Sequence, residues 1–260
     1  MSKREFTDDE LIRRVWDVEE IKKVVNKRVY YQTNEWREQE LNDLWVSEDA
    51  NKATASFGKN TGYYVGMDEI KKYYVDHHIE DRKAQLAAIS AANPEIANTE
   101  ENLHIGCLVS HPVSTGLVEL AGDGKTAKGI WYSIGQETTA NPDGTGTALW
   151  EPGKVAYDFI KEGDEWKIWH LVEANDLYSE AGENYSEQEV YHNYETNPID
   201  IEFGEPTIKV ITHNTDFNWW DNYPAMPEPY DTWSDDISYG PEGFKPVNYG
   251  MNSKEGGNWR

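Results

Sequence analysis

The fold is decided by the stretch Ser110-His-Pro-Val-Ser-Thr-Gly-Leu-Val-Glu-Leu-Ala-Gly-Asp-Gly-Lys-Thr-Ala-Lys-Gly-Ile-Trp131. Residues typical of strands lie on both sides of Asp123-Gly124, and an Asp-Gly pair in that position is a strong hairpin signal. We therefore expect two antiparallel strands, over residues 111–120 and 126–137. The hairpin starts at a histidine, whose imidazole titrates near neutral pH. One segment thus supplies both a pocket wall and an acid–base group.

Two further strands are predicted over residues 155–160 and 165–174, after a loop at 140–146. They are joined by Lys-Glu-Gly-Asp, so they form a second antiparallel hairpin. Strict alternation along the last strand places Trp166, Ile168, His170 and Val172 on one face.

Helices come before these strands. Apolar residues between Asp8 and about Gln32 recur within one broad arc at 100° per residue, which predicts an amphipathic helix. Tyr31 lies at the edge of that arc, whereas Tyr30 points nearly the opposite way. A short helix is expected over residues 35–45, a third starts at Gly66, and a fourth covers 82–92.

Composition excludes several classes of function. The 260 residues carry 24 Lys and Arg against 48 Asp and Glu, a formal charge of −24. That charge repels nucleic acid and anionic membrane surfaces, so neither is an expected partner. The N-terminus lacks an apolar signal region and no run approaches the 18 apolar residues of a membrane span, so we expect a soluble cytoplasmic protein. The single Cys107 excludes an internal disulfide framework and a multi-thiolate metal site.

The composition changes near residue 180, which predicts two parts, 1–180 and 181–260. Residues 181–260 are acidic and rich in Pro, Gly and Asn, but they keep large aromatic rings. We expect an extended C-terminal arm that wraps over the domain or a neighbouring subunit and is anchored by Trp219, Trp220, Tyr230 and Trp233. A loosely ordered acidic tail is the alternative.

The order of elements resembles the SnoaL-like cone fold, found in the superfamily of nuclear transport factor two, scytalone dehydratase, ketosteroid isomerase and bacterial bile-acid dehydratase. The resemblance covers roughly residues 15–178. Three pieces carry it, namely Gly62-Tyr-Tyr-Val-Gly-Met-Asp-Glu-Ile70, the His111 hairpin, and the hairpin from Asp158 to Trp169. It implies an α+β fold: a cone-shaped α+β barrel with N-terminal helices and a curved antiparallel sheet, to which the long extended C-terminal arm is added.

The dehydratase branch of the superfamily implies a strand histidine, a helix tyrosine and an orienting acid around one pocket. In this chain these are His111, Tyr31 or else Tyr30, and Glu137. Such residues suit elimination next to a carbonyl, because His removes an α-proton, Tyr donates to the enolate and a carboxylate fixes the imidazole tautomer. A surface Glu137, a strand-capping His111 and a structural Tyr31 are the alternatives.

One position departs from the family pattern. Dehydratase relatives often carry an aspartate after the first helix, whereas this chain has Thr33-Asn34-Glu35, so either Asn34 or Glu35 takes that role. The further residues expected to contact substrate are Trp131, His170 and Tyr64. No phosphate loop, dinucleotide fingerprint or metal-binding helix is evident, so chemistry without cofactor or metal is expected.

The sequence thus predicts a cofactor-independent lyase of the dehydratase type, or an isomerase, that acts on a ring-containing hydrophobic small molecule. A histidine general base would remove the proton. A non-catalytic ligand-binding or assembly module of the same fold is the alternative. Because the open face of such a sheet usually packs against another subunit, we expect a homodimer or homotrimer.

Overall fold

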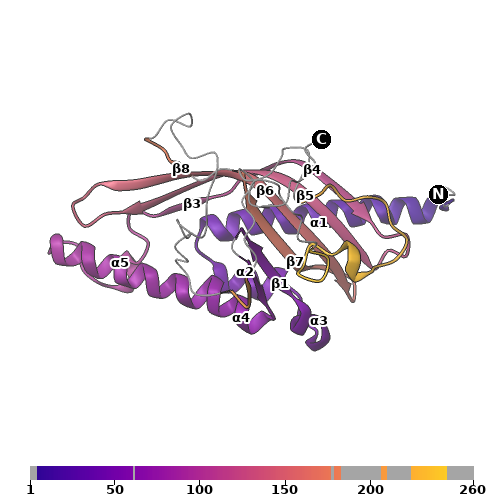
Figure 1. The fold of residues 1–260 in the computed structure, drawn as a ribbon, viewed down its shortest axis with the longest axis horizontal. Coiled ribbons are helices and arrows are strands. Elements are labelled where there is room, and N and C mark those ends of the chain that lie inside the picture. The colour runs from indigo at the N-terminus through magenta and orange to yellow at the C-terminus, as the bar shows by residue number, and fades with distance from the viewer. Residues whose placement is uncertain (1–4, 61, 177–178, 183–205, 210–223, 245–260) are drawn as a thin grey trace, which may run out of the picture.

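The computed structural model describes residues 5–60, 62–176, 179–182, 206–209 and 224–244. It is an α+β fold in which N-terminal helices are followed by a curved, unclosed sheet (Figure 1). The predicted fold class is confirmed. The anchors expected at Trp219 and Trp220 lie outside the described residues.

The helices cover one side of the sheet. The first is capped at Thr7, whose hydroxyl accepts from the backbone N–H of Glu10 while the Glu10 carboxylate accepts from that of Thr7. The segment after Gly66 runs as continuous helix through 67–92, with a π-helical turn where a break was expected. The helical elements are α1 Asp8–Thr33, α2 Arg37–Leu44, α3 Asp49–Thr54, α4 Met67–Lys71, the π-helix Lys72–His77 and α5 His78–Ala92.

The sheet follows the order β3-β5-β6-β7-β1-β2-β9, with β4 also on β5 and β8 also on β6. Every pairing within it is antiparallel except that of β1 with β7, which is parallel. The strands are β1 Ser56–Lys59, β2 Gly62–Val65, β3 Leu108–Ser110, β4 Val113–Leu120, β5 Thr126–Ala140, β6 Gly146–Glu162, β7 Glu165–Asn175, β8 Ser179–Glu180 and β9 Ile208–Lys209.

Strand boundaries differ from the expected ones in two places. His111 and Pro112 form a break between β3 and β4 instead of opening a strand, since proline supplies no N–H to the ladder. The loop expected at 140–146 is a tight turn, and β6 begins at Gly146. Pro152 and Gly153 read as strand breakers in the sequence, yet both pair with β5.

The predicted common face of the last strand is wrong. The register of β6 on β7 shifts between Asp158 and Phe159, where one extra residue, Trp169, interrupts the alternation. Ile168 therefore packs on the helix side of the sheet, while Val172 packs on the opposite side, as does His170 with its partners. A bulge reverses the facing of every residue beyond it.

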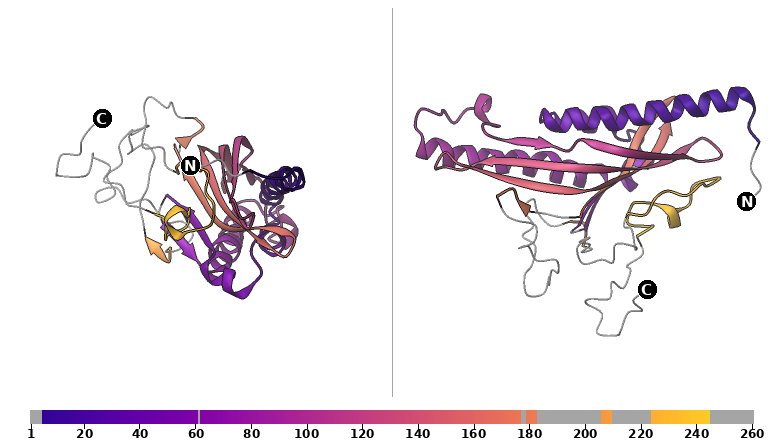
Figure 2. Two further views of the ribbon diagram at one scale, coloured as in Figure 1. Left: turned by 90° about the vertical axis from the view of Figure 1, so that its right-hand side faces the viewer. Right: turned by 90° about the horizontal axis from the view of Figure 1, so that it is seen from above.

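The sheet has two covered faces. The inner face packs on the helices through the larger core, with Trp45, Phe57 and Tyr157 fully buried. The outer face carries a smaller core that includes Tyr239 and Phe244 from residues 224–244. Figure 2 shows this yellow segment on the side of the sheet away from α1. Within the described part of the chain, no helix has the length and apolar character needed to span a bilayer.

Candidate functional site

His111 and Glu137 meet on the inner face of the sheet. The Nε2 atom of His111 lies 3.0 Å from Oε1 of Glu137, although the residues are 26 positions apart. The register explains this, because Val109 on β3 pairs with Glu137 on β5. Burial acts to raise the pKa of Glu137, but the bond to His111 and its charge outweigh burial and hold that pKa below its usual value. Glu137 is thus an anionic partner that orients the imidazole.

A glycine makes room for this imidazole. A Cβ atom on Gly135 would lie 2.7 Å from Cε1 of His111 and 2.6 Å from the carbonyl oxygen of Glu151. Both distances are too short for carbon, so the ring rests directly on the β5 backbone. Gly135 thereby fixes where the histidine lies.

Glu151, on β6 opposite Gly135, adds a second carboxyl group. Burial and the nearby charge of Glu137 raise its pKa to about 7. Its Oε2 accepts a hydrogen bond of 2.9 Å from the side chain of Asn175. At neutral pH Glu151 therefore carries a proton part of the time and can act as a general acid.

The same three side chains are the ones that could hold a metal ion. Ligand atoms of His111, Glu137 and Glu151 lie within 4.8 Å of one another. One imidazole and two carboxylates suit a divalent transition metal. Lys59 and Arg37 already supply positive charge to Glu137, and Lys59 does so to Glu151.

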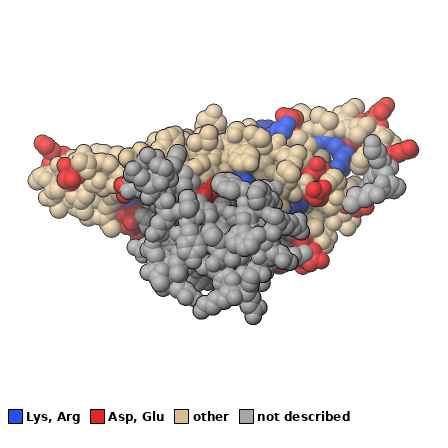
Figure 3. All heavy atoms as spheres, turned by 45° about the horizontal axis from the view of Figure 1, so that its top comes forward, with Lys and Arg blue, Asp and Glu red and all other residues tan. Residues whose placement is uncertain are grey.

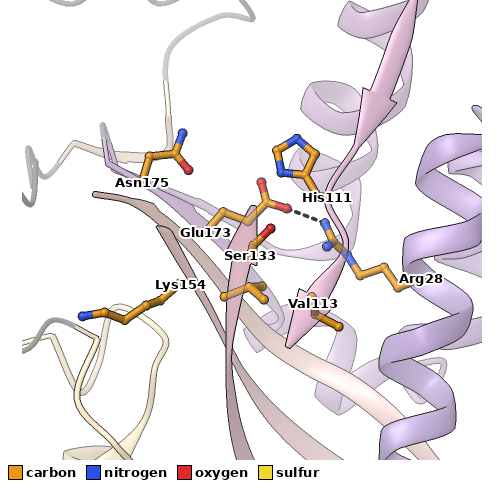
Figure 4. A pocket seen from close by; sticks show the side chains of 8 residues that line it. Arg28, His111, Val113, Ser133, Lys154, Glu173 and Asn175 are labelled. Atoms are coloured by element: carbon orange, nitrogen blue, oxygen red, sulfur yellow. Dashed lines mark hydrogen bonds and ion pairs between the residues drawn. The ribbon is translucent and has the colours of Figure 1, made fainter. Parts of the chain in front are cut away.

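A small hollow lies beside His111, and Arg28, Ser133 and Glu173 also line it. In Figure 4 the side chains of His111, Ser133 and Glu173 point toward one another, and Lys154 points away. Arg28 donates to Glu173 at 2.7 Å and to the buried Glu40 at 3.2 Å. The hydroxyl of Ser133 is buried without a hydrogen-bond partner in the described part of the chain.

A second histidine–carboxylate pair joins the α1–α2 turn to α5. Nε2 of His78 lies 2.7 Å from Oε2 of Glu35, and both side chains are nearly buried. Glu35 has φ +59°, a strained value for a residue other than glycine, and such strain is concentrated at functional sites. Burial acts to raise its pKa, but His78 and Arg37 lower it to about 2. The pKa of His78 is lowered by burial and by nearby arginines, against the effect of Glu35.

Arg37 connects the two pairs. Its Nε donates to Glu35 at 2.9 Å, and its charge also lowers the pKa of Glu137. The guanidinium lies over the ring of Tyr74, 4.7 Å from its centroid. Arg37 therefore acts electrostatically on the carboxylates of both pairs.

The helix residues predicted for the site do not join His111. Tyr30 is 70% exposed. Tyr31 packs against the core as expected, but its hydroxyl donates to Asp43 at 2.9 Å, and this bond raises its pKa. The side-chain amide of Asn34 donates to the backbone carbonyl of Tyr30 and ends the helix.

The three predicted substrate contacts lie in three different settings. Trp131 is buried on the inner face, edge-on to Tyr157, with ring centroids 5.5 Å apart. The ring of Tyr64 is stacked on that of Tyr73, with centroids 3.9 Å apart. His170 lies on the outer face, where Nδ1 is 2.9 Å from Asp158 and 3.1 Å from the Ser238 hydroxyl.

Sequence reasoning missed Glu151 and the role of His78. Glu151 falls between the loop expected at 140–146 and the strand expected from residue 155, in a segment given no element, so its alternation with Val155 and Tyr157 was hidden. Had β6 been extended to Gly146, that alternation would have placed Glu151 on the inner face. His78 gave no such signal, because the π-helical turn before it changes the helical period.

The fold and the site define an α+β protein whose curved sheet encloses paired histidines and carboxylates. The sequence profile of the SnoaL-like domain matches residues 13–172, more than half of the chain. The chain therefore belongs to the SnoaL-like domain family.

Solved structures that resemble this one are remote in sequence. A protein described as a scytalone dehydratase from Novosphingobium aromaticivorans is 11% identical, with a TM-score of 0.44, covering 66% of this chain and 91% of its own. A hexachlorocyclohexane dehydrochlorinase from Novosphingobium barchaimii is 12% identical, with a TM-score of 0.45, and the shares covered are 67% and 97%. At these scores nothing about activity follows. No curated protein matches the chain.

Proposed function

We propose that this protein is a lyase of the dehydratase type, or an isomerase, that moves a proton of a small molecule by histidine base catalysis without a cofactor. One observation carries the proposal: two histidine–carboxylate pairs, with N···O distances of 3.0 and 2.7 Å, whose carboxylates are both influenced by Arg37. A carboxylate that holds an imidazole in one tautomer is the usual way to prepare a general base.

His111 is the first candidate base because it lines the hollow. With its Nε2–H donating to Glu137, the lone pair of Nδ1 is free to take a proton from a substrate carbon. For an elimination, Glu151 then gives its proton to the departing hydroxyl group, which leaves as water. The pKa of Glu151, raised to about 7, suits a group that must hold and release a proton near neutral pH.

His78 is the second candidate base. Its lowered pKa keeps the imidazole neutral near pH 7, as a base requires. The lining of the interior also bears on the substrate. Because Arg28, Ser133 and Glu173 accompany Val113 and Val155 around the hollow, we propose a ring-containing substrate that carries polar groups.

Deuterium exchange tests the proposal before any product is known. The protein is incubated in D₂O with a panel of hydroxylated cyclic ketones, and NMR follows loss of the proton next to the carbonyl. We expect exchange with at least one compound, and a fall of roughly 10²–10⁴-fold in His111→Gln or His78→Gln. His77→Gln, which changes a partly exposed neighbour, is the control. Exchange that is equal in all four proteins would refute histidine base catalysis.

A non-catalytic ligand-binding module is the second candidate function. The polar lining of the hollow favours it, since Arg28, Ser133 and Glu173 can hold a small polar group without reacting with it. Binding of a panel compound without exchange at any carbon, in wild type and variants alike, would support the module over the enzyme.

A further inference from the structure

Arg82 is a buried cation without an anionic partner among the described residues. It lies on α5 with 4% of its surface exposed. Its guanidinium donates from Nη1 to the side-chain oxygen of Gln85, a neutral group, at 3.1 Å. Its Nε has no hydrogen-bond partner in the described part of the chain.

The other buried cations have carboxylate partners. Three Arg or Lys side chains are buried among the described residues, namely Arg28, Arg82 and Lys128. Arg28 pairs with Glu40 and Glu173, and Lys128 pairs with Asp158. A buried charge without a partner is strongly unfavourable, because the desolvation of the charge is not offset. Of these three cations, Arg82 is the one without a carboxylate partner among the described residues.

The neighbouring carboxylate of Glu35 is engaged through one of its oxygens, while its Oε1 has no hydrogen-bond partner among the described residues. Glu35 receives hydrogen bonds from Arg37 and pairs with His78 through the same oxygen, Oε2. Arg82 follows His78 by one helical turn, so the two lie on the same face of α5. Arg37 therefore has a carboxylate partner in Glu35, whereas Arg82 forms no ion pair among the described residues.

We propose that Arg82 binds a carboxylate group of the substrate next to the His78–Glu35 pair. The planar guanidinium matches a carboxylate with two parallel N–H···O bonds, and the free Nε–H is one of the donors of that fork. The substrate class is therefore a small ring-bearing carboxylic acid. This inference rests on the proposed function, because it names the substrate that the acid–base site receives.

Benzoate and benzamide test the proposal, because they share a ring and a planar head group but only benzoate is charged. Isothermal titration of the full chain near pH 7 should show binding of benzoate and little or none of benzamide. Arg82→Gln should weaken benzoate binding about tenfold or more, because loss of a charged hydrogen bond usually lowers affinity by that factor. Arg82→Lys should retain part of it. Lys83→Gln removes the same charge from the exposed neighbouring position and should leave binding unchanged.

A second measurement does not depend on a variant. Benzoate should shift the NMR signals of the His78 ring in wild-type protein, and raise the pH at which that ring titrates, because an added anion favours the imidazolium. Equal binding of benzoate and benzamide, unchanged benzoate affinity in a folded Arg82→Gln, or no effect on the His78 ring would each overturn the proposal. Neither measurement needs turnover, so failure of the proposed acid–base chemistry is read separately, from deuterium exchange.

Discussion

The position of the His111 imidazole depends on the missing side chain of Gly135. In Gly135→Ala the new methyl group would meet the ring at 2.7 Å and the Glu151 carbonyl at 2.6 Å, so the ring must move away from Glu137. We expect exchange activity to fall at least about tenfold and unfolding free energy to drop by about 1–3 kcal/mol, as for overpacking. Gly146→Ala is the control, since its nearest neighbour would lie at 3.5 Å. An unchanged His111–Glu137 distance in a crystal structure of the variant would contradict this account.

The raised pKa of Glu151 predicts how the free energy of unfolding depends on pH. Its pKa is raised from 4.5 to about 7, so the folded state holds a proton that the unfolded state has lost between those values. Stability from this group is therefore present below about pH 4.5 and is lost as pH rises through about 7. Urea unfolding between pH 5 and 8 should show a decline in wild type that is smaller in Glu151→Gln. Parallel curves for the two proteins would show that Glu151 has an ordinary pKa.

The positions of single side chains could be predicted from the sequence where the resemblance or the local periodicity placed them, but their hydrogen-bond partners could not. His111 and Glu137 were expected to meet because the resemblance to the dehydratase branch implies an acid beside the strand histidine, and they do lie within hydrogen-bond distance. Tyr31 was correctly placed against the core, but a helical wheel does not reveal that Asp43 binds its hydroxyl. The sequence did not decide whether Asn34 or Glu35 takes the place of the family aspartate. The left-handed backbone at Glu35, which turns its carboxylate toward His78, is not visible in the sequence.

Elements differ from the sequence patterns where one residue is inserted. The extra residue in β7 places His170 on the outer face, and the π-helical turn before α5 carries His78 into the interior. The extra residue in β7, Trp169, contacts a distant segment, since its ring lies tilted against that of Trp233 with centroids 4.9 Å apart. Such contacts come from distant segments, so alternation along a single strand or helix does not contain them.

The C-terminal segment 224–244 is attached to the outer face through Asp158. This fully buried carboxylate accepts from Lys128 at 2.5 Å, and from the backbone N–H of Tyr239 at 2.6 Å. Asp158→Asn should leave the buried ammonium of Lys128 unpaired and cost about 3–5 kcal/mol of unfolding free energy. Amide exchange at 235–240 should rise as the segment loosens. Glu19→Gln breaks an exposed pair and should cost at most about 1 kcal/mol. Equal losses of unfolding free energy in both variants would show that the buried pair stabilises the fold no more than an exposed pair.

The assembly of the whole molecule stays a prediction. We expect a homodimer or homotrimer, although residues 224–244 already cover part of the outer face of the sheet. Exposed apolar side chains remain on α1, among them Ile12, Val15 and Trp16, which are 66–68% exposed. Light scattering of the purified full chain at several concentrations measures the state directly. A monomer at all concentrations would contradict the expectation.

The formal charge of −24 predicts how the whole molecule responds to salt. Acidic side chains lie at both ends of the face in Figure 3, so repulsion acts across the surface. Raising NaCl from 10 to 150 mM shortens the screening length from about 30 to about 8 Å, and should weaken that repulsion more than the buried ion pairs. We expect the melting temperature to rise by a few degrees, since about 1 kcal/mol corresponds to roughly 2–4 °C at this size. Choline chloride should act alike if screening is the cause, and near pH 4, where carboxylates become protonated, the rise should shrink. A melting temperature that falls with salt would show that exposed ion pairs outweigh the net repulsion.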